Sequence, residues 1–234
     1  MKATFVEKKQ LTEGISSFSF KPAQPYRYTS GQFIELTLSG HHEDGKPAKR
    51  WFTLSSTPLD ALLTITTRVG TDQHSVFKRA LNNLASGAEV DISEPMGDFV
   101  LPKFIQTPLI FIAGGIGVTP FRSMLEWLAL TSEQRPIRML YSVKKEEDII
   151  FQDTFDAAKQ HVTIVVDDPS AAWGGERGHL TAEMVLGLKQ PTDDTLLYIS
   201  GPEPFVQKLQ ADLIALGVSR QQIVVDEFQG YEAL

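Results

Sequence analysis

Apolar and polar residues alternate in short segments along the N-terminal part of the chain, up to about residue 95. An alternation with a period of two is typical of β-strands. Glycine, proline, aspartate or asparagine stands in most of the gaps, and many short strands with such turns favour an antiparallel barrel or sandwich. The pattern therefore predicts strands over 3–11, 15–22, 31–40, 50–56, 62–70 and 88–95.

A helical period interrupts the alternation once. Apolar residues recur at helical spacing between Val76 and Leu84, which predicts a helix over 74–84 that stops before Gly87. The tract 39–50 is polar throughout and is expected to be a flexible hairpin loop.

Beyond Pro102 continuous apolar runs alternate with helical patterns, as they do in parallel βαβ units. The predicted fold is therefore α/β with two domains. An antiparallel β-barrel covers residues 1–103, and a parallel-sheet, Rossmann-like domain covers 104–234. The second domain is expected to contain strands over 107–115, 137–143, 162–166, 195–200 and 222–228, with helices over 119–130, 151–160 and 204–217.

Charge and composition narrow the function classes. The 234 residues carry a net charge of −7, which argues against a nucleic-acid surface. The absence of cysteine excludes disulfides, thiolate zinc sites and cysteine-ligated iron–sulfur clusters within this chain. No apolar run reaches the length of a membrane span or a signal peptide, so a cytoplasmic location is expected. No metal site is predicted.

Two glycine-containing turns follow predicted buried strands. The first, AGGIGVTP, contains Gly114, Gly115 and Gly117, and Thr119 is placed to cap the next helix or to bind a ligand. The second, ISGPEPF, ends a strand at Gly201 and starts a helix. Paired turns at the carboxyl ends of parallel strands create the crevice in which open α/β sheets bind ligands, and helix N-termini favour phosphate.

The stretch RWFTLSSTP, Arg50 to Pro58, joins a cation, aromatic rings and hydroxyls. On a strand, Arg50, Phe52 and Leu54 would share one face, and Trp51, Thr53 and Ser55 the other. A cation beside an aromatic ring suits a ligand with both a phosphate and a flat ring. An ordinary barrel strand with an exposed arginine is the alternative.

These motifs together resemble the ferredoxin–NADP reductase family. RWFTLSSTP is similar to its flavin motif, Arg-x-Tyr-Ser, and EPMGDFVL is similar to the stretch that closes its flavin barrel. AGGIGVTPFRSML resembles its nicotinamide-nucleotide loop, SGPEPF its second nucleotide turn, and WGGERGHLT the connection into the helix before that turn. The resemblance holds in order and spacing over nearly the whole chain.

The resemblance implies an FAD-dependent NAD(P)H oxidoreductase, in which hydride passes from nicotinamide to flavin. Arg50 would pair with the flavin phosphates, Phe52 would lie against the isoalloxazine ring, and Thr53 would hydrogen-bond flavin N5. The expected flavin-binding residues are Arg50, Trp51, Phe52, Thr53, Leu54, Ile65, Thr67 and Ser75. The expected nucleotide-binding residues are Gly114, Gly115, Gly117, Thr119, Pro120, Ser142, Lys144, Gly201, Pro202, Glu203 and Phe205.

The chain departs from the family pattern in three places. Phe52 lacks the tyrosine hydroxyl that would bond the ribityl chain, and Phe205 stands where the family often has methionine. Asp72, Gln73 and His74 replace the glycines expected before Ser75, which weakens the expected contact with the pyrophosphate. The resemblance implies FAD, and FMN stays open as the less favoured flavin.

The C-terminal stretch VVDEFQGYEAL supplies the other predicted catalytic residues. In relatives an aromatic side chain near the C-terminus covers the flavin. Tyr231 is preferred for that role over Phe228, and Glu227 is placed to pass a proton towards the flavin. A last strand with a packed phenylalanine is the alternative.

NADPH is favoured over NADH, and the electron acceptor stays open. Ser142 and Lys144 suit the extra phosphate of NADPH, whereas an acid at this place would bind the ribose hydroxyls of NADH. An ordinary charged helix N-terminus, with the acids after Lys145 matching its dipole, is the alternative. The acceptor is a one-electron carrier protein, ferredoxin or flavodoxin, which Lys8, Lys9, Lys46 and Lys49 would steer, or a small molecule such as a free flavin or ferric chelate. A nucleotide-binding regulatory module without turnover is the third reading.

Overall fold

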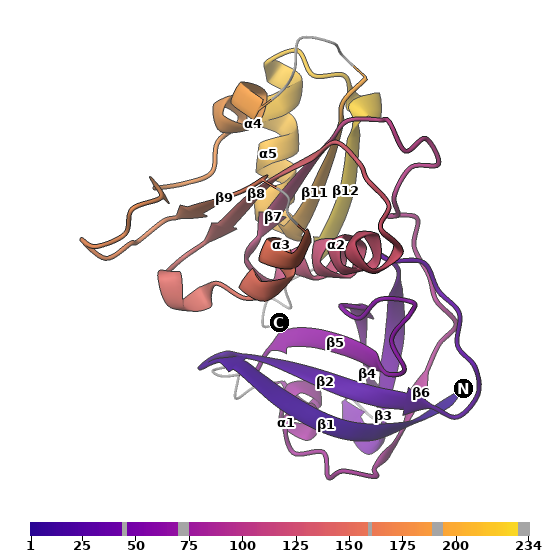
Figure 1. The fold of residues 1–234 in the computed structure, drawn as a ribbon. Coiled ribbons are helices and arrows are strands. Elements are labelled where there is room, and N and C mark those ends of the chain that lie inside the picture. The colour runs from indigo at the N-terminus through magenta and orange to yellow at the C-terminus, as the bar shows by residue number, and fades with distance from the viewer. Residues whose placement is uncertain (44–45, 70–74, 159–160, 189–193, 229–234) are drawn as a thin grey trace.

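The computed structural model describes residues 1–43, 46–69, 75–158, 161–188 and 194–228, and it has two domains (Figure 1). An antiparallel sheet, curved like a barrel, forms the N-terminal domain. A parallel sheet with helices on both faces forms the C-terminal domain. The predicted two-domain α/β fold is therefore confirmed.

The N-terminal sheet has six strands in the order β4-β3-β6-β1-β2-β5. Its two edge strands are joined only by an isolated bridge between Leu54 and Ile65, so the barrel is incompletely closed. A single short helix, α1, packs against β3 and β4. The elements are β1 Lys2–Thr12, β2 Ile15–Pro22, β3 Phe33–Glu43, β4 Lys46–Thr53, β5 Leu63–Arg68, α1 Val76–Asn82 and β6 Glu89–Ile92.

Alternation along these strands builds the barrel core. Phe18 and Phe20 on β2, Ile34 and Leu36 on β3, and Phe77 on α1 are fully buried in one apolar cluster. Side chains two apart along a strand share a face, so each strand contributes every second residue to this cluster.

The C-terminal sheet has the order β10-β9-β8-β7-β11-β12, and all of its pairings are parallel. The central strand β7 is buried along its whole length, as the apolar run predicted. The strands are β7 Leu109–Gly114, β8 Ile137–Val143, β9 His161–Val166, β10 Glu176–Arg177, β11 Leu196–Pro202 and β12 Ile223–Phe228.

Helices cover both faces of this sheet. Figure 1 shows α2 and α3 between the sheet and the barrel, with α4 and α5 on the opposite face. No helix in the described part of the chain is long and apolar enough to cross a membrane. The helices are α2 Thr119–Thr131, α3 Gln152–Ala158, α4 Ala182–Leu188 and α5 Glu203–Ala215, with short 3₁₀ turns at 115–118, 146–148 and 220–222.

The two domains share an apolar core. Ile15 of β2 and Phe99 of the connection are buried in the cluster that α2 forms with the parallel sheet. Gly31 packs so tightly here that an added Cβ would lie 1.9 Å from the Phe99 backbone oxygen. The connection from Ile92 to Leu109 contains the predicted domain boundary at 103/104, which stays a proposal.

The expectation that the tract 39–50 is a flexible loop is wrong. Strands β3 and β4 extend through most of it as a hairpin. A two-stranded ribbon needs no apolar face when water can reach both sides, so the absence of apolar alternation did not exclude strands. The short strand β10 has no counterpart among the strands predicted from the pattern, because two polar residues carry no periodicity.

Candidate functional site

Strand β4 has the two-faced arrangement that its sequence predicted. The Arg50 guanidinium lies 5.6 Å from the centre of the Phe77 ring, and the Phe52 and Phe77 rings are also 5.6 Å apart. The cation and the aromatic side chains therefore gather on one side of β4, next to α1. This is the combination expected to hold a phosphate beside a flat ring.

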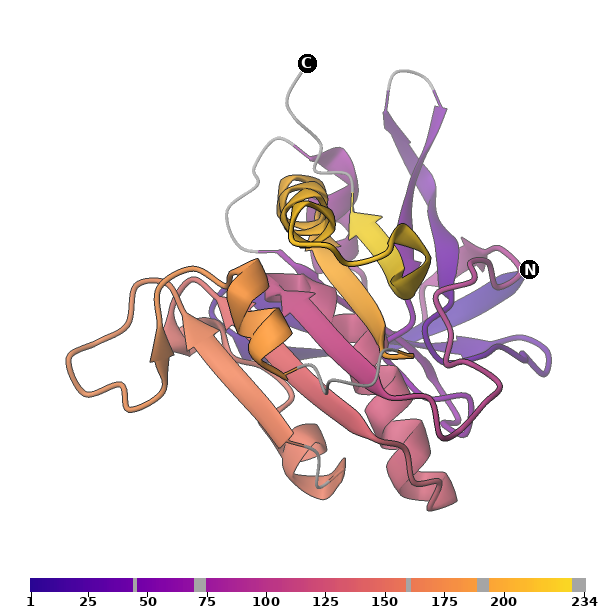
Figure 2. The same ribbon diagram turned by 90° about the horizontal axis from the view of Figure 1, so that it is seen from above.

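The opposite face of β4 presents Trp51 and Thr53. Trp51 is 63% exposed and lies 6.4 Å from the Phe33 ring, centre to centre. Thr53, two residues along, is buried where the barrel meets the outer strand β12 of the parallel sheet. In Figure 2 β12, drawn in yellow, lies on the same side of the molecule as the β3–β4 hairpin.

Thr53, Ser200 and Asp226 form a polar cluster at this junction. The Ser200 hydroxyl donates to Asp226 Oδ2 at 3.3 Å, and the Thr53 hydroxyl lies near enough to the carboxyl group to lower its pKa. Burial raises the pKa of Asp226 to about 6, against the opposing effect of the two hydroxyls, while nearby Glu227 adds to the rise. A carboxyl group with such a pKa can hold or release a proton near neutral pH.

Glu227, predicted to pass a proton, lies on the other face of β12 and is exposed. Asp226, which the sequence reasoning missed, occupies the place next to Thr53 instead. The parallel pairing sets Asp226 opposite Ser200, and no periodicity in the sequence shows that register. Tyr231, the predicted flavin cap, lies outside the described residues, and the side chain of Phe228 is likewise not described.

The two predicted glycine turns pack directly against each other. A Cβ at Gly117 would lie 2.2 Å from the Ser200 backbone oxygen, and Cβ atoms at Gly114 and Gly201 would meet the Phe205 ring at 2.8 and 2.9 Å. At these positions the small size of glycine is used to bring the turns together, and Phe205 fills the space beside them.

Helices α2 and α5 both begin at these turns. Neither has a side chain that caps its first N–H groups. The Thr119 N–H already donates to the Ile116 backbone oxygen, and Pro120 and Pro204 have no N–H, so the helix dipoles and the remaining N–H groups are what suit a diphosphate. The expected capping by Thr119 is wrong, because Thr119 is the first residue of α2 and its hydroxyl donates to the Ile116 backbone oxygen at 3.1 Å.

The remaining predicted residues lie near the two halves of the site. Leu54 and Ile65 are core side chains, so only their backbone is available to a cofactor. Ser75 caps α1 by accepting from the Lys78 N–H at 3.2 Å. Thr67 is half-buried on β5. Pro120 is buried in the first turn of α2, and Pro202 precedes Glu203 at the start of α5.

Carboxylates dominate the edge of the sheet beyond β8 and β9. Ser142 is half-buried on β8 and Lys144 is exposed. The Lys144 backbone oxygen accepts from the Asp168 N–H at 2.9 Å, and Glu146 Oε1 accepts from the Ser170 N–H at 2.8 Å. These two hydrogen bonds join the loops after β8 and β9, and the loop that contains Lys144 also carries acidic residues.

Arg68, at the end of β5, reaches the nucleotide domain and was not predicted. Its Nη1 lies 3.2 Å from Asp148 Oδ1, and its Nη2 is near Gly115, 3.7 Å from where a Cβ would be. A guanidinium beside the glycine turn adds positive charge where a diphosphate would bind.

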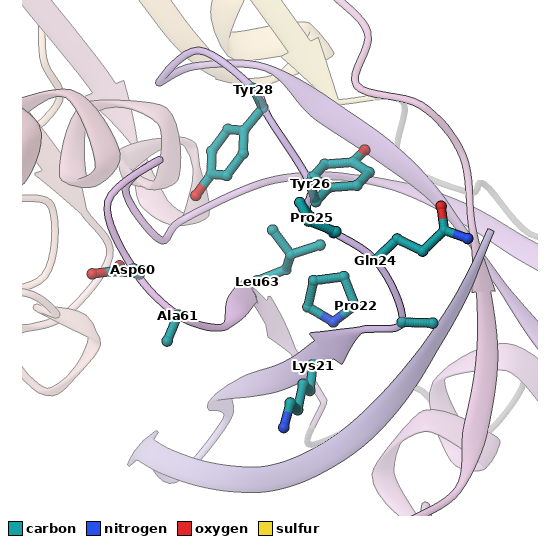
Figure 3. Close-up of a pocket in the computed structure, with 10 residues that line it drawn as sticks. Lys21, Pro22, Gln24, Pro25, Tyr26, Tyr28, Asp60, Ala61 and Leu63 are labelled. Atoms are coloured by element: carbon teal, nitrogen blue, oxygen red, sulfur yellow. The ribbon is translucent and has the colours of Figure 1, made fainter.

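A hollow of about 310 Å³ lies elsewhere on the barrel, between the end of β2 and the loop before β5 (Figure 3). Tyr26, Tyr28, Asp60 and Leu63 are among its lining residues. The hydroxyl of Tyr28 hydrogen-bonds Ser56 Oγ and that of Tyr26 donates to the Ser93 backbone oxygen, each at 2.8 Å. None of the predicted site residues lines this hollow, so it is not the site assembled around Thr53.

The residues present fit a flavin and a nicotinamide nucleotide. Arg50 and the partly buried Phe52 suit the flavin, with the buried Phe77 ring packed behind them, and the starts of α2 and α5 suit a dinucleotide diphosphate. The Thr53–Asp226–Ser200 cluster lies between these two groups of residues. Its buried carboxyl group supplies a proton donor and acceptor at the meeting point.

Comparison with protein families identifies one domain. Residues 111–211 match the model of the oxidoreductase NAD-binding domain. The chain is 28% identical over 212 residues to NADH oxidoreductase HCR of Escherichia coli, a match covering 90% of this chain and 63% of that relative.

Solved structures share the complete fold. The flavohem-like FAD/NAD binding domain of nitric oxide dioxygenase from Vibrio cholerae matches with a TM-score of 0.82 and 23% identity, over 98% of both chains. A ferredoxin NADP⁺ reductase from Neisseria gonorrhoeae, with bound FAD and NADP, matches with a TM-score of 0.81 and 20% identity, over 97% of this chain and 98% of that one.

Proposed function

We propose that this chain, which matches the oxidoreductase NAD-binding domain at residues 111–211 and shares the fold of a ferredoxin NADP⁺ reductase, takes hydride from NAD(P)H and passes electrons on to a separate acceptor. FAD, when bound, accepts the hydride and can release its two electrons singly. The observation that carries the proposal is the Thr53–Asp226–Ser200 cluster at the junction of the barrel and both nucleotide turns.

The chain's own residues have the following roles in this proposal. Arg50 pairs with the phosphates of FAD, and Phe52 lies along its ring. The starts of α2 and α5, with Arg68, hold the diphosphate of the nicotinamide nucleotide. Together they bring the two rings into contact and exclude water, which is the protein's part in hydride transfer.

Thr53 and Asp226 would handle the proton that leaves flavin N5 when the reduced flavin passes its electrons on, because the hydride itself supplies the hydrogen at N5 during reduction. The Thr53 hydroxyl would hydrogen-bond N5 and pass that proton to the Asp226 carboxylate. A pKa near 6 lets Asp226 exchange that proton with water between turnovers.

NADH is the proposed donor. Lys144, which favoured NADPH in the sequence, is followed by Glu146, Glu147 and Asp148. Its backbone oxygen accepts from the N–H of Asp168 after β9, so these two loops together carry several carboxylates. These repel the extra phosphate of NADPH and suit the ribose hydroxyls of NADH. The measurement is the rate of flavin reduction with each nucleotide.

Ferredoxin or flavodoxin is the first candidate acceptor, and a small molecule is the second. One observation favours the second. Lys49 pairs with Glu35 at 2.8 Å and Lys8 donates to Asn82 at 2.6 Å, so two of the lysines expected to steer an acidic carrier are engaged within the barrel.

The test is an anaerobic visible spectrum of the purified protein, recorded before and after NADH or NADPH is added. A flavin spectrum that bleaches on mixing supports the proposal. The reduced protein is then offered ferredoxin, flavodoxin and a ferric chelate at several salt concentrations. A protein that stays colourless and unreactive after reconstitution with FAD would contradict turnover and favour a nucleotide-binding module.

A further inference from the structure

The first turns of α2 are hydrogen-bonded to the barrel. Arg122 Nη1 donates to the Ser55 backbone oxygen, and the Ser123 hydroxyl donates to the Ser56 backbone oxygen. In return, the Ser30 hydroxyl of the barrel donates to the Ser123 backbone oxygen at 3.2 Å. We call these contacts the α2 clasp. Each contact has a backbone oxygen as its acceptor, so the contacts fix the backbone of one domain relative to the other.

Arg122 is held from several sides. Its Nη2 lies 2.6 Å from Glu126 Oε2, one turn along α2, and its guanidinium lies 5.6 Å from the centre of the Phe151 ring. The side chain of Arg122 is only 21% exposed. Phe151 adopts a φ of 65°, a backbone conformation that favours glycine, so the ring is kept against Arg122 at a cost in backbone strain.

The clasp lies between the two halves of the candidate site. Ser55 follows Thr53 by two residues along the chain. Thr119, which begins α2 at the end of the glycine turn, precedes Arg122 by three. Gly117 in that turn packs on the Ser200 backbone oxygen. A displacement of α2 relative to Ser55 would therefore move the nucleotide turn relative to Thr53.

We propose that Arg122 is a positioning residue, which fixes the offset between the strand end carrying Thr53 and the glycine turn that begins α2. The inference rests on the proposed function, because the offset sets how closely the nicotinamide and flavin rings approach. A planar guanidinium with several fixed donors suits this task better than an ammonium group on a flexible stem.

The ion pair between Arg68 of the barrel and Asp148 of the nucleotide domain is a weaker candidate. Arg68 is 46% exposed and its single close contact with Asp148 is 3.2 Å long. Water and salt screen such a pair, so it contributes little to a fixed geometry.

Arg122→Gln is the test variant. We expect the rate constant of flavin reduction at saturating nucleotide to fall roughly 10- to 100-fold, with the nucleotide dissociation constant changed by less than about twofold. A stopped-flow measurement under anaerobic conditions gives both values. An unchanged rate constant would overturn the inference.

A second readout needs neither cofactor nor turnover. The chain has no cysteine, so Ala85→Cys on the barrel and Ala211→Cys on α5 can be spin-labelled without background. We expect Arg122→Gln to broaden the distance distribution between the labels, measured by double electron–electron resonance. A lower reduction rate with an unchanged distribution would overturn the positioning role.

Tyr198→Phe is the matched control. It removes another bond between the nucleotide sheet and the connection, from the Tyr198 hydroxyl to the Val100 backbone oxygen at 2.8 Å. We expect it to lower the unfolding midpoint without slowing flavin reduction. An equal slowing would mean that any loosening between the domains has this effect, and would overturn the specific role of Arg122.

Two further outcomes are separable. If Arg122→Gln does not fold, Ser123→Ala removes one hydroxyl from the same clasp and is expected to slow flavin reduction in the same direction, though less. If the unsubstituted protein is not reduced by either nucleotide, the proposed function fails, while the distance measurement still tests the clasp.

Discussion

Replacing Asp226 by asparagine should make stability depend less on pH. The folded protein raises the pKa of this carboxyl group from 3.8 to about 6, chiefly through burial. Because each pH unit is worth about 1.4 kcal/mol, the ionised carboxylate costs the folded state about 3 kcal/mol. Asparagine has nearly the same shape and never ionises, so it removes that cost.

The sign of the effect follows from the direction of the pKa change. A carboxyl group with a raised pKa favours the folded state fully below about pH 3.8, and this contribution disappears as the pH rises through about 6. Asp226→Asn and the unsubstituted protein should therefore be equally stable near pH 4. By about pH 7 the variant should be the more stable by about 3 kcal/mol.

Urea unfolding between pH 4 and pH 7 measures this difference. Glu227→Gln is the matched control, because it removes the same charge from the exposed neighbour on β12. Its stability relative to the unsubstituted protein should change little across this range. A difference for Asp226→Asn that stays constant with pH, or that grows towards acid pH, would refute the assignment of a buried, protonated carboxyl group.

Three other changes give distinct results. Gly31→Ala places a Cβ against a backbone oxygen at a φ of 101° and should destabilise the fold by at least about 2 kcal/mol, measured by urea unfolding. Gly14→Ala, which meets no atom within 4 Å, is its control, and equal effects would contradict the packing argument. Arg50→Ala should weaken FAD retention about tenfold, measured after dialysis, whereas Lys49→Ala should not. Gly117→Ala should abolish reduction by the nicotinamide nucleotide while the FAD content is preserved, and normal reduction would show that the two turns need not touch.

The two-domain fold predicted from the sequence is confirmed, and the predicted nicotinamide-nucleotide domain matches the oxidoreductase NAD-binding domain over residues 111–211. The FAD-dependent activity belongs to the proposed function. Periodicity located the strands because each buries one face or both. The separation of Arg50 and Phe52 from Trp51 and Thr53 followed from the same rule. The individual assignments of cofactor contacts stay predictions.

Glu227 was preferred to Asp226 in the sequence because alternation along β12 does not say which face meets the barrel. Val224 packs in the core that faces the barrel, and Asp226 follows it on the same side, while Glu227 points away. Knowing the pairing of β12 with β11 would have chosen Asp226. That pairing is a long-range fact which no local pattern contains.

Arg122 and Phe99 were missed as residues that join the domains for a related reason. A helical or alternating period shows that a side chain is buried, and it does not show against which domain. Phe99 lies in a segment predicted to close the barrel, yet its ring packs in the core of the nucleotide domain.

The apolar core shared by the two domains also affects whether either domain could be stable without the other. Cutting the chain within its connection would expose Ile15 and Phe99 on one half and the apolar surface of α2 on the other. Neither domain should therefore be stable by itself, and we expect the two domains to unfold in a single transition. The Escherichia coli relative, of which this chain spans 63%, aligns with both domains in one stretch. The shared core therefore makes the two domains one folding unit, and the match to that relative spans both of them.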